Sequence, residues 1–215
     1  MSLLRRWFGA DRGSEPLRWV VVDVETTGLD MDHDELLAIA AIAVHFDGVA
    51  REPRIVLADS FESVLQRESA SADKDNILLH GIGVGAQRAG APPAEVLAAF
   101  ERWAGAAPLV AYHAAFDQAM IGRAMKAYRG HGLRNAWLDL APVATGLCPE
   151  VKVHALDDWL DHFAIPCAVR HQAAADTLAT AELLLRLWPL ARAQRCADLA
   201  ALQRLADNQR WLGTR

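Results

Sequence analysis

The sequence predicts a mixed α/β domain, in which helices cover the faces of a central sheet. Three apolar runs come first, at residues 17–25, 36–46 and 54–58, and short polar turns separate them. This order predicts an antiparallel meander of three strands. Two shorter apolar runs, at 109–112 and 136–140, alternate with helical patterns, which predicts two further strands joined by parallel crossovers. The expected sheet therefore has five strands.

Apolar residues recurring at helical spacing predict five helices. They are expected over residues 93–104, 116–128, 156–165, 178–189 and 197–211. Prolines are expected to end two of them, one before Pro166 and the other near Pro189. Residues 60–90 are rich in small and polar residues, so we expect mostly loop there, with one or two short helical pieces.

The chain of 215 residues is long enough for one sizeable core. We expect an N-terminal arm over 1–16, a main domain over 17–190, and a C-terminal helix over 191–215 that packs on the domain or extends it. Leu3, Leu4, Trp7 and Phe8 leave open a membrane or partner contact through the arm.

Composition narrows the class of protein. The net charge of -5 argues against a broad basic surface for nucleic acid, although a small site with local positive charge is compatible with it. The three cysteines fit no common zinc or redox motif, and their odd number suits a reducing compartment. No apolar run is long enough for a membrane helix, and the N-terminus lacks a signal peptide. We therefore expect a cytoplasmic protein.

The first strand ends in an unusual way. Asp23 and Glu25 point to the same side of the strand, and the preceding residues of that side, Leu17, Trp19 and Val21, are all apolar. Two neighbouring carboxylates repel each other unless a positive group lies between them, and Mg²⁺ is often held by one or two carboxylates. The sequence therefore indicates a metal site here, while a simple polar turn around Gly28 explains the same residues.

Two other segments place acids near element ends. Asp117 falls in the first turn of a helix that follows a strand, where a carboxylate is also favoured by the helix dipole alone. His171 and Asp176 are five residues apart and would share a site if His171 lay in the loop and Asp176 in the first turns of the next helix. Two polar residues on the protein surface, with no shared site, would explain this pair equally well.

Taken together, these segments resemble the DnaQ-like exonucleases of the DEDDh type, which are similar to the proofreading epsilon subunit of bacterial DNA polymerase III. The resemblance covers residues 17–190 and implies a ribonuclease H-like fold. Smaller matches are His80-Gly81-Ile82, Asp139-Leu140 and the segment 156–166. The residues that carry it are Asp23, Glu25, Phe116, Asp117, His171 and Asp176.

The resemblance implies a role for each of these residues. Asp23 would bridge two divalent metal ions, Mg²⁺ or Mn²⁺. Glu25 and Asp176 would hold the ion that activates water, and Asp117 would help to hold the other. His171 would take the proton from that water, which suits a side chain that titrates near neutrality. The product would be a nucleoside 5'-monophosphate released from a 3' end.

The resemblance also implies residues that contact substrate. Thr26, Thr27 and Gly28 would form a turn close to the terminal nucleotide. His80 would touch substrate or hydrogen-bond within its loop, and Phe116 would pack against a base or lie in the core.

One position departs from the family pattern. The family often has Asn where this chain has His113. We expect His113 to support the site from behind the ligands, with direct metal binding and a plain structural role as alternatives.

The predicted function is a metal-dependent 3'–5' exonuclease acting on single-stranded ends, with DNA favoured over RNA and a polymerase or repair partner compatible with the resemblance. The alternatives are an exoribonuclease or oligonucleotide-trimming enzyme, a non-catalytic module of the same fold, and an unrelated metal-dependent phosphatase. A basic path along Arg123, Lys126, Arg129 and Arg134 would suit a substrate backbone. Both a monomer and a homodimer are compatible with the sequence.

Overall fold

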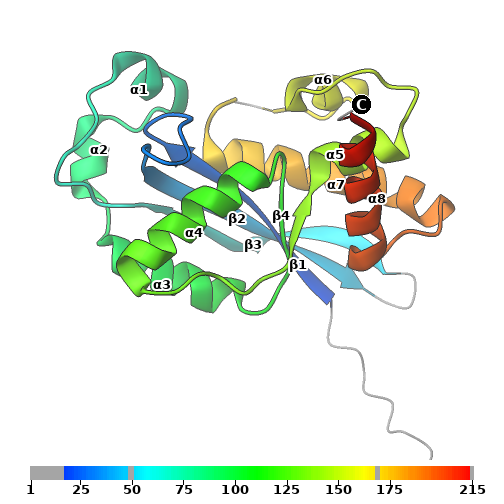
Figure 1. The fold of residues 1–215 in the computed structure, drawn as a ribbon, viewed down its shortest axis with the longest axis horizontal. Helices are drawn as coiled ribbons and strands as arrows, with labels where there is room; N and C mark the ends of the chain where they lie inside the picture. The colour runs from blue at the N-terminus through cyan, green and yellow to red at the C-terminus, as the bar shows by residue number, and fades with distance from the viewer. Residues whose placement is uncertain (1–16, 48–50, 168–169, 214–215) are drawn as a thin grey trace, which may run out of the picture.

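A computed structural model describes residues 17–47, 51–167 and 170–213. The expected N-terminal arm and its membrane or partner contact lie outside the described residues. In the described part, two layers of helices enclose one sheet (Figure 1).

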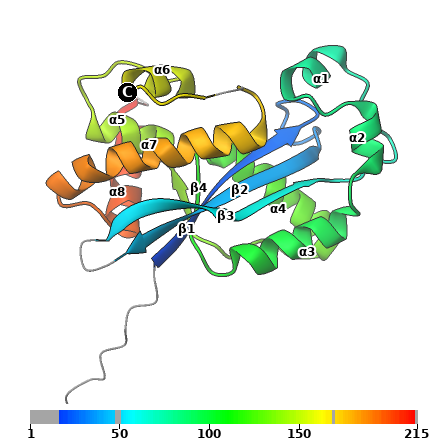
Figure 2. The ribbon, with the colours of Figure 1, turned by 180° about the vertical axis from the view of Figure 1, so that it is seen from behind.

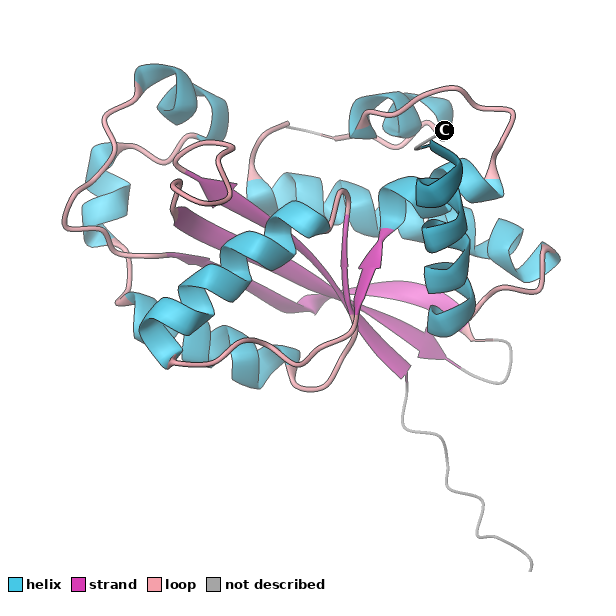
Figure 3. Ribbon diagram, viewed as in Figure 1, coloured by secondary structure: helices cyan, strands magenta, loops and turns pink. Residues whose placement is uncertain are grey.

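The sheet confirms the predicted layout of five strands in a mixed arrangement. Its order is β3-β2-β1-β4-β5, with β1–β2 and β2–β3 antiparallel and β1–β4 and β4–β5 parallel (Figure 3). The strands are β1 Leu17–Thr26, β2 Leu36–Asp47, β3 Glu52–Val64, β4 Leu109–Ala111 and β5 Trp137–Asp139.

Strand β3 is longer than the strand that the sequence pattern predicts, and an irregularity divides it into two parts. Ile42 of β2 pairs with Ser60 while Ala43 pairs with Val56, so residues 57–59 bulge out of the ladder. Within the bulge, Asp59 accepts hydrogen bonds from Arg18 at 2.8 and 2.9 Å. Because the bulge breaks the alternation of apolar and polar residues, the pattern predicts a strand only up to residue 58.

Eight helices are seen in the described residues. They are α1 Lys74–His80, α2 Val84–Ala89, α3 Pro93–Ala104, α4 Ala115–Arg129, α5 Leu140–Leu147, α6 Leu156–His162, α7 Ala173–Ala193 and α8 Leu199–Gly213. The expectation of one or two short helical pieces within 60–90 is confirmed by α1 and α2. The expected end near Pro189 is wrong, since α7 continues to Ala193. Pro189 removes one intrahelical hydrogen bond, and the packing of α7 in the core offsets that loss.

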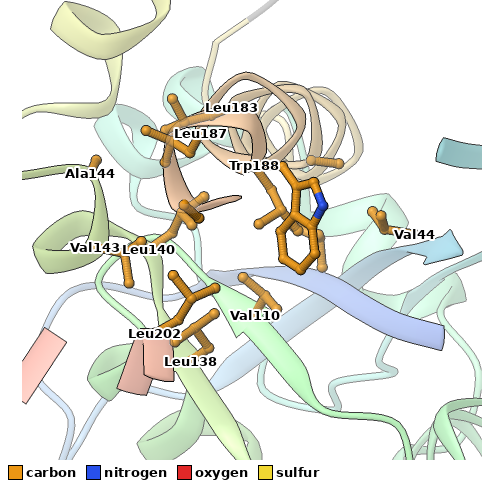
Figure 4. Packing of buried hydrophobic residues seen from close by; sticks show 14 of the residues in the cluster. Val44, Val110, Leu138, Leu140, Val143, Ala144, Leu183, Leu187, Trp188 and Leu202 are labelled. Carbon is orange, nitrogen blue, oxygen red and sulfur yellow. The ribbon is translucent and has the colours of Figure 1, made fainter. Parts of the chain in front are cut away.

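The two faces of β1 bury two separate cores. Trp19 and Val21 face α5 and α7, whereas Val20 and Val22 face α3 and α4. Helix α7 lies across the sheet on one side and α4 on the other (Figure 2). Figure 4 shows the first core, in which Trp188 of α7 packs over the sheet.

Two of the tryptophans on the helices are fully enclosed. Trp159 and Trp188 are 0% and 1% exposed, and Trp103 is partly buried against the second core. They are therefore packing residues rather than platforms for bases. No helix in the described part of the chain is both long and apolar enough to cross a membrane.

Candidate active site

The acidic end of β1 continues a core face. Trp19 and Val21 are 1% and 0% exposed, and Asp23 and Glu25 follow on the same side of the strand. The ladder to β2 is regular up to Glu25 and shifts between Glu25 and Thr26. The regular ladder fixes the backbone of both acids, so their side chains project from a rigid element.

Helix α4 brings the third acid to the same end of β1. Asp117 lies in the first turn of α4 and is 4% exposed. Burial raises its pKa to about 8; the charge of Asp139 adds to the rise, and backbone hydrogen bonds, including one with Val24, oppose it. The contact with Val24 places Asp117 beside the strand that carries Asp23 and Glu25.

Helix α7 supplies the fourth acid. Helix α7 begins at Ala173, earlier than the expected start at 178, so that His171 precedes the helix and Asp176 lies in its first turn. This is the arrangement that would let the pair share a site. The Asp176 carboxylate is buried and accepts a hydrogen bond from the backbone N–H of His171 at 3.0 Å. The His171 ring itself is exposed. Backbone geometry at His171 is unusual, because its φ of 60° lies in the left-handed region.

The four carboxylates interact electrostatically. Burial raises the pKa of Asp23 well above its ordinary value, and the charges of Asp117, Glu25 and Asp176 raise it further. Burial and the charge of Asp176 raise the pKa of Glu25 to about 7, against a hydrogen bond with the Ala173 backbone. Groups from β1, α4 and α7 therefore share one electrostatic field that opposes ionisation and favours a cation.

The donor set fits a hard divalent cation, because it consists of carboxylate oxygens. Within the described residues, no three His, Cys, Asp or Glu side chains stand close enough to form a complete metal site. Arg170 instead pairs with both Asp176 and Asp157, and its charge lowers the pKa of Asp23. A guanidinium thus provides part of the positive charge that the cluster requires.

The turn after β1 is held by its own side chains. Thr26 donates to the Gly28 carbonyl at 2.6 Å, and Thr27 donates to Asp34 at 2.7 Å. Gly28 permits this arrangement, since a Cβ there would lie 2.8 Å from Asp34 Cγ. The hydroxyl groups of Thr26 and Thr27 are therefore engaged within the turn that is predicted to lie close to substrate.

Helix α1 packs against this turn. Asn76 Nδ2 donates to the Thr26 carbonyl at 3.0 Å. At the end of α1, His80 is 4% exposed, and its Nδ1 accepts from the Ile82 N–H at 2.9 Å. Its Nε2 is buried and has no hydrogen-bond partner in the described structure. The local hydrogen bond is the loop role expected as one alternative for His80.

Large apolar side chains project into solvent beside the acids. They lie on the turn after β1 and on α1, two segments joined through Asn76. The most exposed are Leu29 at 86% and Leu78 at 82%; Met31 and Leu79 are about half exposed. Sequence reasoning missed them, because an apolar residue in a turn or a short helix is normally assigned to the core. Such a surface suits the flat faces of nucleobases.

The remaining predicted residues lie around this centre. Phe116 is partly buried and packs against the second core, which matches the core alternative. His113 has an exposed side chain whose ring meets Tyr112 edge-on at 4.7 Å, and its backbone N–H donates to Asp139 at 3.0 Å. Any support from His113 therefore passes through its backbone.

The basic residues along α4 are partly engaged by protein groups. A cavity of about 670 Å³ lies between α4, the turn after β1 and residues 65–69. Arg123 lines it and donates to the Met31 carbonyl at 2.7 Å, while Arg129 lies 3.7 Å from Glu101. Arg67, on the opposite wall, pairs with Glu35. The two arginines that line this cavity therefore already have partners, an acid for Arg67 and a backbone carbonyl for Arg123.

The sequence of the chain matches a known family over most of its length. A family model described as Exonuclease, the RNase T model, matches residues 20–184. The chain belongs to this exonuclease family, which confirms the DnaQ-like resemblance and the ribonuclease H-like fold.

Two relatives show how the family domain occurs elsewhere. The chain is 33% identical over 198 residues to a DNA polymerase III subunit epsilon-like protein of Rhodobacter capsulatus, covering 90% of this chain and 27% of that protein. It is 30% identical over 178 residues to the PolC-type DNA polymerase III of Oceanobacillus iheyensis, covering 83% of this chain and 12% of that protein. The chain thus spans only a small part of the length of these relatives.

Solved structures share the fold at low identity. Escherichia coli Exonuclease I in complex with a dT13 oligonucleotide matches with a TM-score of 0.67 and 15% identity, over 82% of this chain and 42% of that one. Exonuclease X in complex with 5' overhanging duplex DNA matches with a TM-score of 0.64 and 16% identity, over 87% of this chain and 99% of that one. These likenesses establish the fold.

Proposed function

We propose that the chain is a metal-dependent 3'–5' exonuclease that releases nucleoside 5'-monophosphates from single-stranded DNA. The observation that carries this proposal is the convergence of Asp23, Glu25, Asp117 and Asp176 from three elements in a chain of the exonuclease family. Burial raises the pKa values of Asp23, Glu25 and Asp117, so ionising these three acids is costly without a cation, and a reaction that uses a cation explains their position.

The four carboxylates would hold two divalent ions, Mg²⁺ or Mn²⁺. When bound, such ions supply Lewis-acid stabilisation of the charge that develops on the phosphate and the leaving oxygen. The protein contributes a rigid strand end under Asp23 and Glu25, a helix start under Asp117, and the first turn of α7 under Asp176. These elements fix the carboxylates before substrate arrives.

His171 would take the proton from the attacking water. Its ring is exposed, while its backbone is fixed by the hydrogen bond to Asp176. An imidazole side chain is suited to general-base catalysis at neutral pH. The exposed ring would meet that water at the edge of the acid cluster, outside the core.

The exposed apolar residues beside the acids would receive the terminal bases. Leu29 and Leu78 offer sequence-independent contact, which suits a nuclease that removes any nucleotide. The DNA named in the Exonuclease I and Exonuclease X structures supports DNA as the substrate, and the polymerase relatives support a polymerase partner.

The test uses 5'-labelled single-stranded DNA and the matching RNA, each with Mg²⁺ or Mn²⁺. We expect the DNA to shorten one nucleotide at a time from its 3' end, and Asp23→Ala to abolish the shortening. Asp161→Ala is the matched control, since Asp161 is an exposed acid on α6. Faster shortening of the RNA would make the protein an exoribonuclease, and no shortening of either would refute the proposal.

A further inference from the structure

A fifth buried carboxylate stands behind the acid cluster. Asp139, at the end of β5, is 8% exposed. Its Oδ1 accepts hydrogen bonds from the backbone N–H groups of His113 at 3.0 Å and Ala141 at 3.1 Å. Its Oδ2 accepts a hydrogen bond from Arg210 Nη2 at 2.9 Å. One side chain therefore joins the turn before α4, the start of α5, and α8.

The turn that receives this bond leads directly to Asp117. His113 has a φ of 61°, in the left-handed region that side chains other than glycine rarely adopt. The following helix has no side-chain cap at Ala114. Asp139 thus supplies the side-chain hydrogen bond seen at this turn, and the direction in which α4 presents Asp117 depends on it.

Helix α8 is fitted closely enough to place Arg210. A Cβ on Gly146 of α5 would lie 2.8 Å from Leu205 Cδ1, so the missing side chain allows the helices to approach. Gln203 Nε2 donates to the Trp137 carbonyl at 3.0 Å, which ties α8 to the edge of the sheet. Arg210 is held further by Asp207 at 3.1 Å.

We propose that Arg210 is a positioning residue for the active site, 71 residues beyond the carboxylate that it holds. Its guanidinium fixes the rotation of the Asp139 carboxylate, so that Oδ1 faces the His113 amide and the turn presents Asp117 in one orientation. Arg210 also balances a charge that acts on Asp117. The inference rests on the proposed nuclease function, because it assigns Arg210 to that reaction.

A purely structural ion pair is the competing explanation. Asp139 is buried, but Arg210 is about half exposed, so solvent weakens their attraction and the pair contributes little to stability. In that case its loss would loosen α8 without affecting the His113 turn. The two explanations differ in what happens at one backbone amide more than 90 residues away in sequence.

The experiment compares Arg210→Ala, Arg210→Lys and the control Arg204→Ala in the full chain. Arg204 lies on the same helix, is exposed and carries the same charge. Amide hydrogen exchange at His113 is measured by NMR without metal, together with the Tm. With Mg²⁺ and labelled DNA, kcat and KM are measured separately.

We expect Arg210→Ala to raise exchange at His113 by about tenfold, with exchange in the β1 core unchanged. The kcat should fall by about tenfold while KM changes by less than about twofold, because the fault lies in the orientation of Asp117. Arg210→Lys should recover part of both effects, and Arg204→Ala should resemble the wild type.

Two results would overturn the inference. One is unchanged exchange at His113 in Arg210→Ala. The other is faster exchange throughout the protein with a lower Tm, which would mark a purely structural role. If the wild type cuts no nucleic acid, the proposed function fails on its own, and exchange at His113 still decides whether Arg210 controls the turn.

Discussion

Two histidine turns enter the helices that carry candidate acids, and they are built from different parts. His113 and His171 have nearly equal φ values of 61° and 60°, and each donates its backbone N–H to a carboxylate at 3.0 Å. At His113 the acceptor is Asp139, a residue outside the four-acid cluster. At His171 it is Asp176, a member of that cluster.

The His113 turn is therefore fixed by a residue outside the acid cluster, whereas the His171 turn is coupled to a member of the cluster. The His113 turn is held by Asp139 and Arg210. The His171 turn is held by a carboxylate that also pairs with Arg170 and, in the proposed reaction, would bind metal. We therefore expect the first turn to be insensitive to metal and the second to change when metal binds. The following predictions test that contrast.

The largest effect is expected at Asp176. Asp176→Ala should lower kcat by at least about a thousandfold, because it removes both a metal ligand and the acceptor for the His171 amide. Asp176→Asn keeps an acceptor oxygen, so it should lose similar activity while preserving slow amide exchange at His171. Comparable exchange in the two variants would show that Asp176 does not hold this turn.

The next largest effect is expected in a comparison of the two histidines, whose loss should lower kcat by different amounts. His171→Ala should reduce kcat by about a hundredfold or more, as expected for the loss of a general base. His113→Ala keeps the backbone N–H that contacts Asp139, and should change kcat by less than about threefold. The measurement is single-turnover cleavage of labelled DNA at pH 7.5. Equal losses in both variants would contradict the assignment of His113 to a backbone role.

The charge cluster should make the metal-free protein less stable as pH rises. The folded-state pKa values of Glu25 and Asp117, about 7 and about 8, lie above the ordinary values of 4.5 and 3.8. Raised acid pKa values stabilise the fold fully below about pH 4, and this stabilisation is lost as pH rises through 7 and 8. Urea unfolding with a chelator, between pH 5 and 9, measures the loss.

Asp117→Asn sharpens this test. At pH 8.5 without metal, the variant should be more stable than the wild type by on the order of 1–3 kcal/mol, since it removes a buried charge. The difference should shrink as pH falls and disappear below about pH 4, where Asp117 is protonated in both the folded and the unfolded chain. Mg²⁺ should stabilise the wild type more than the variant at neutral pH. A wild-type stability that rises between pH 6 and 9 would show that other groups dominate.

The smallest effect is expected at Arg170. Because its guanidinium pairs with Asp176, Arg170→Ala should lower the Mg²⁺ concentration that gives half-maximal activity by about two- to fivefold. Arg186→Ala is the control, because Arg186 is an exposed arginine on α7, the helix that carries Asp176. A higher Mg²⁺ requirement, or lost activity at saturating Mg²⁺, would indicate that Arg170 contacts substrate instead.

The features that the sequence predicted well are local. Parity along one strand places Asp23 and Glu25 on the same side, because it depends on backbone geometry over a few residues. The start of α7 was expected at 178, five residues too late, so the position of Asp176 within the helix was left open. The five-strand layout follows from the same periodicities.

The features that escaped prediction depend on distant contacts or irregular backbone. The pairing of Asp139 with Arg210 joins residues 71 positions apart, and nothing in either segment signals it. Helix α5 was not expected, since LAPVATGL contains both a proline and a glycine. The exposure of Leu78 depends on where α1 packs, which its own seven residues do not determine.

The bulge in β3 affects whether a strand from another chain can pair with the edge of this sheet. As the outermost strand on its side of the sheet, β3 could serve as a template for a strand from another chain. Residues 57–59 interrupt its hydrogen-bond ladder, and Asp59 is fixed inward by Arg18 and His45. A foreign strand could follow only one half of β3, so the irregular edge protects a long, partly apolar strand from aggregation.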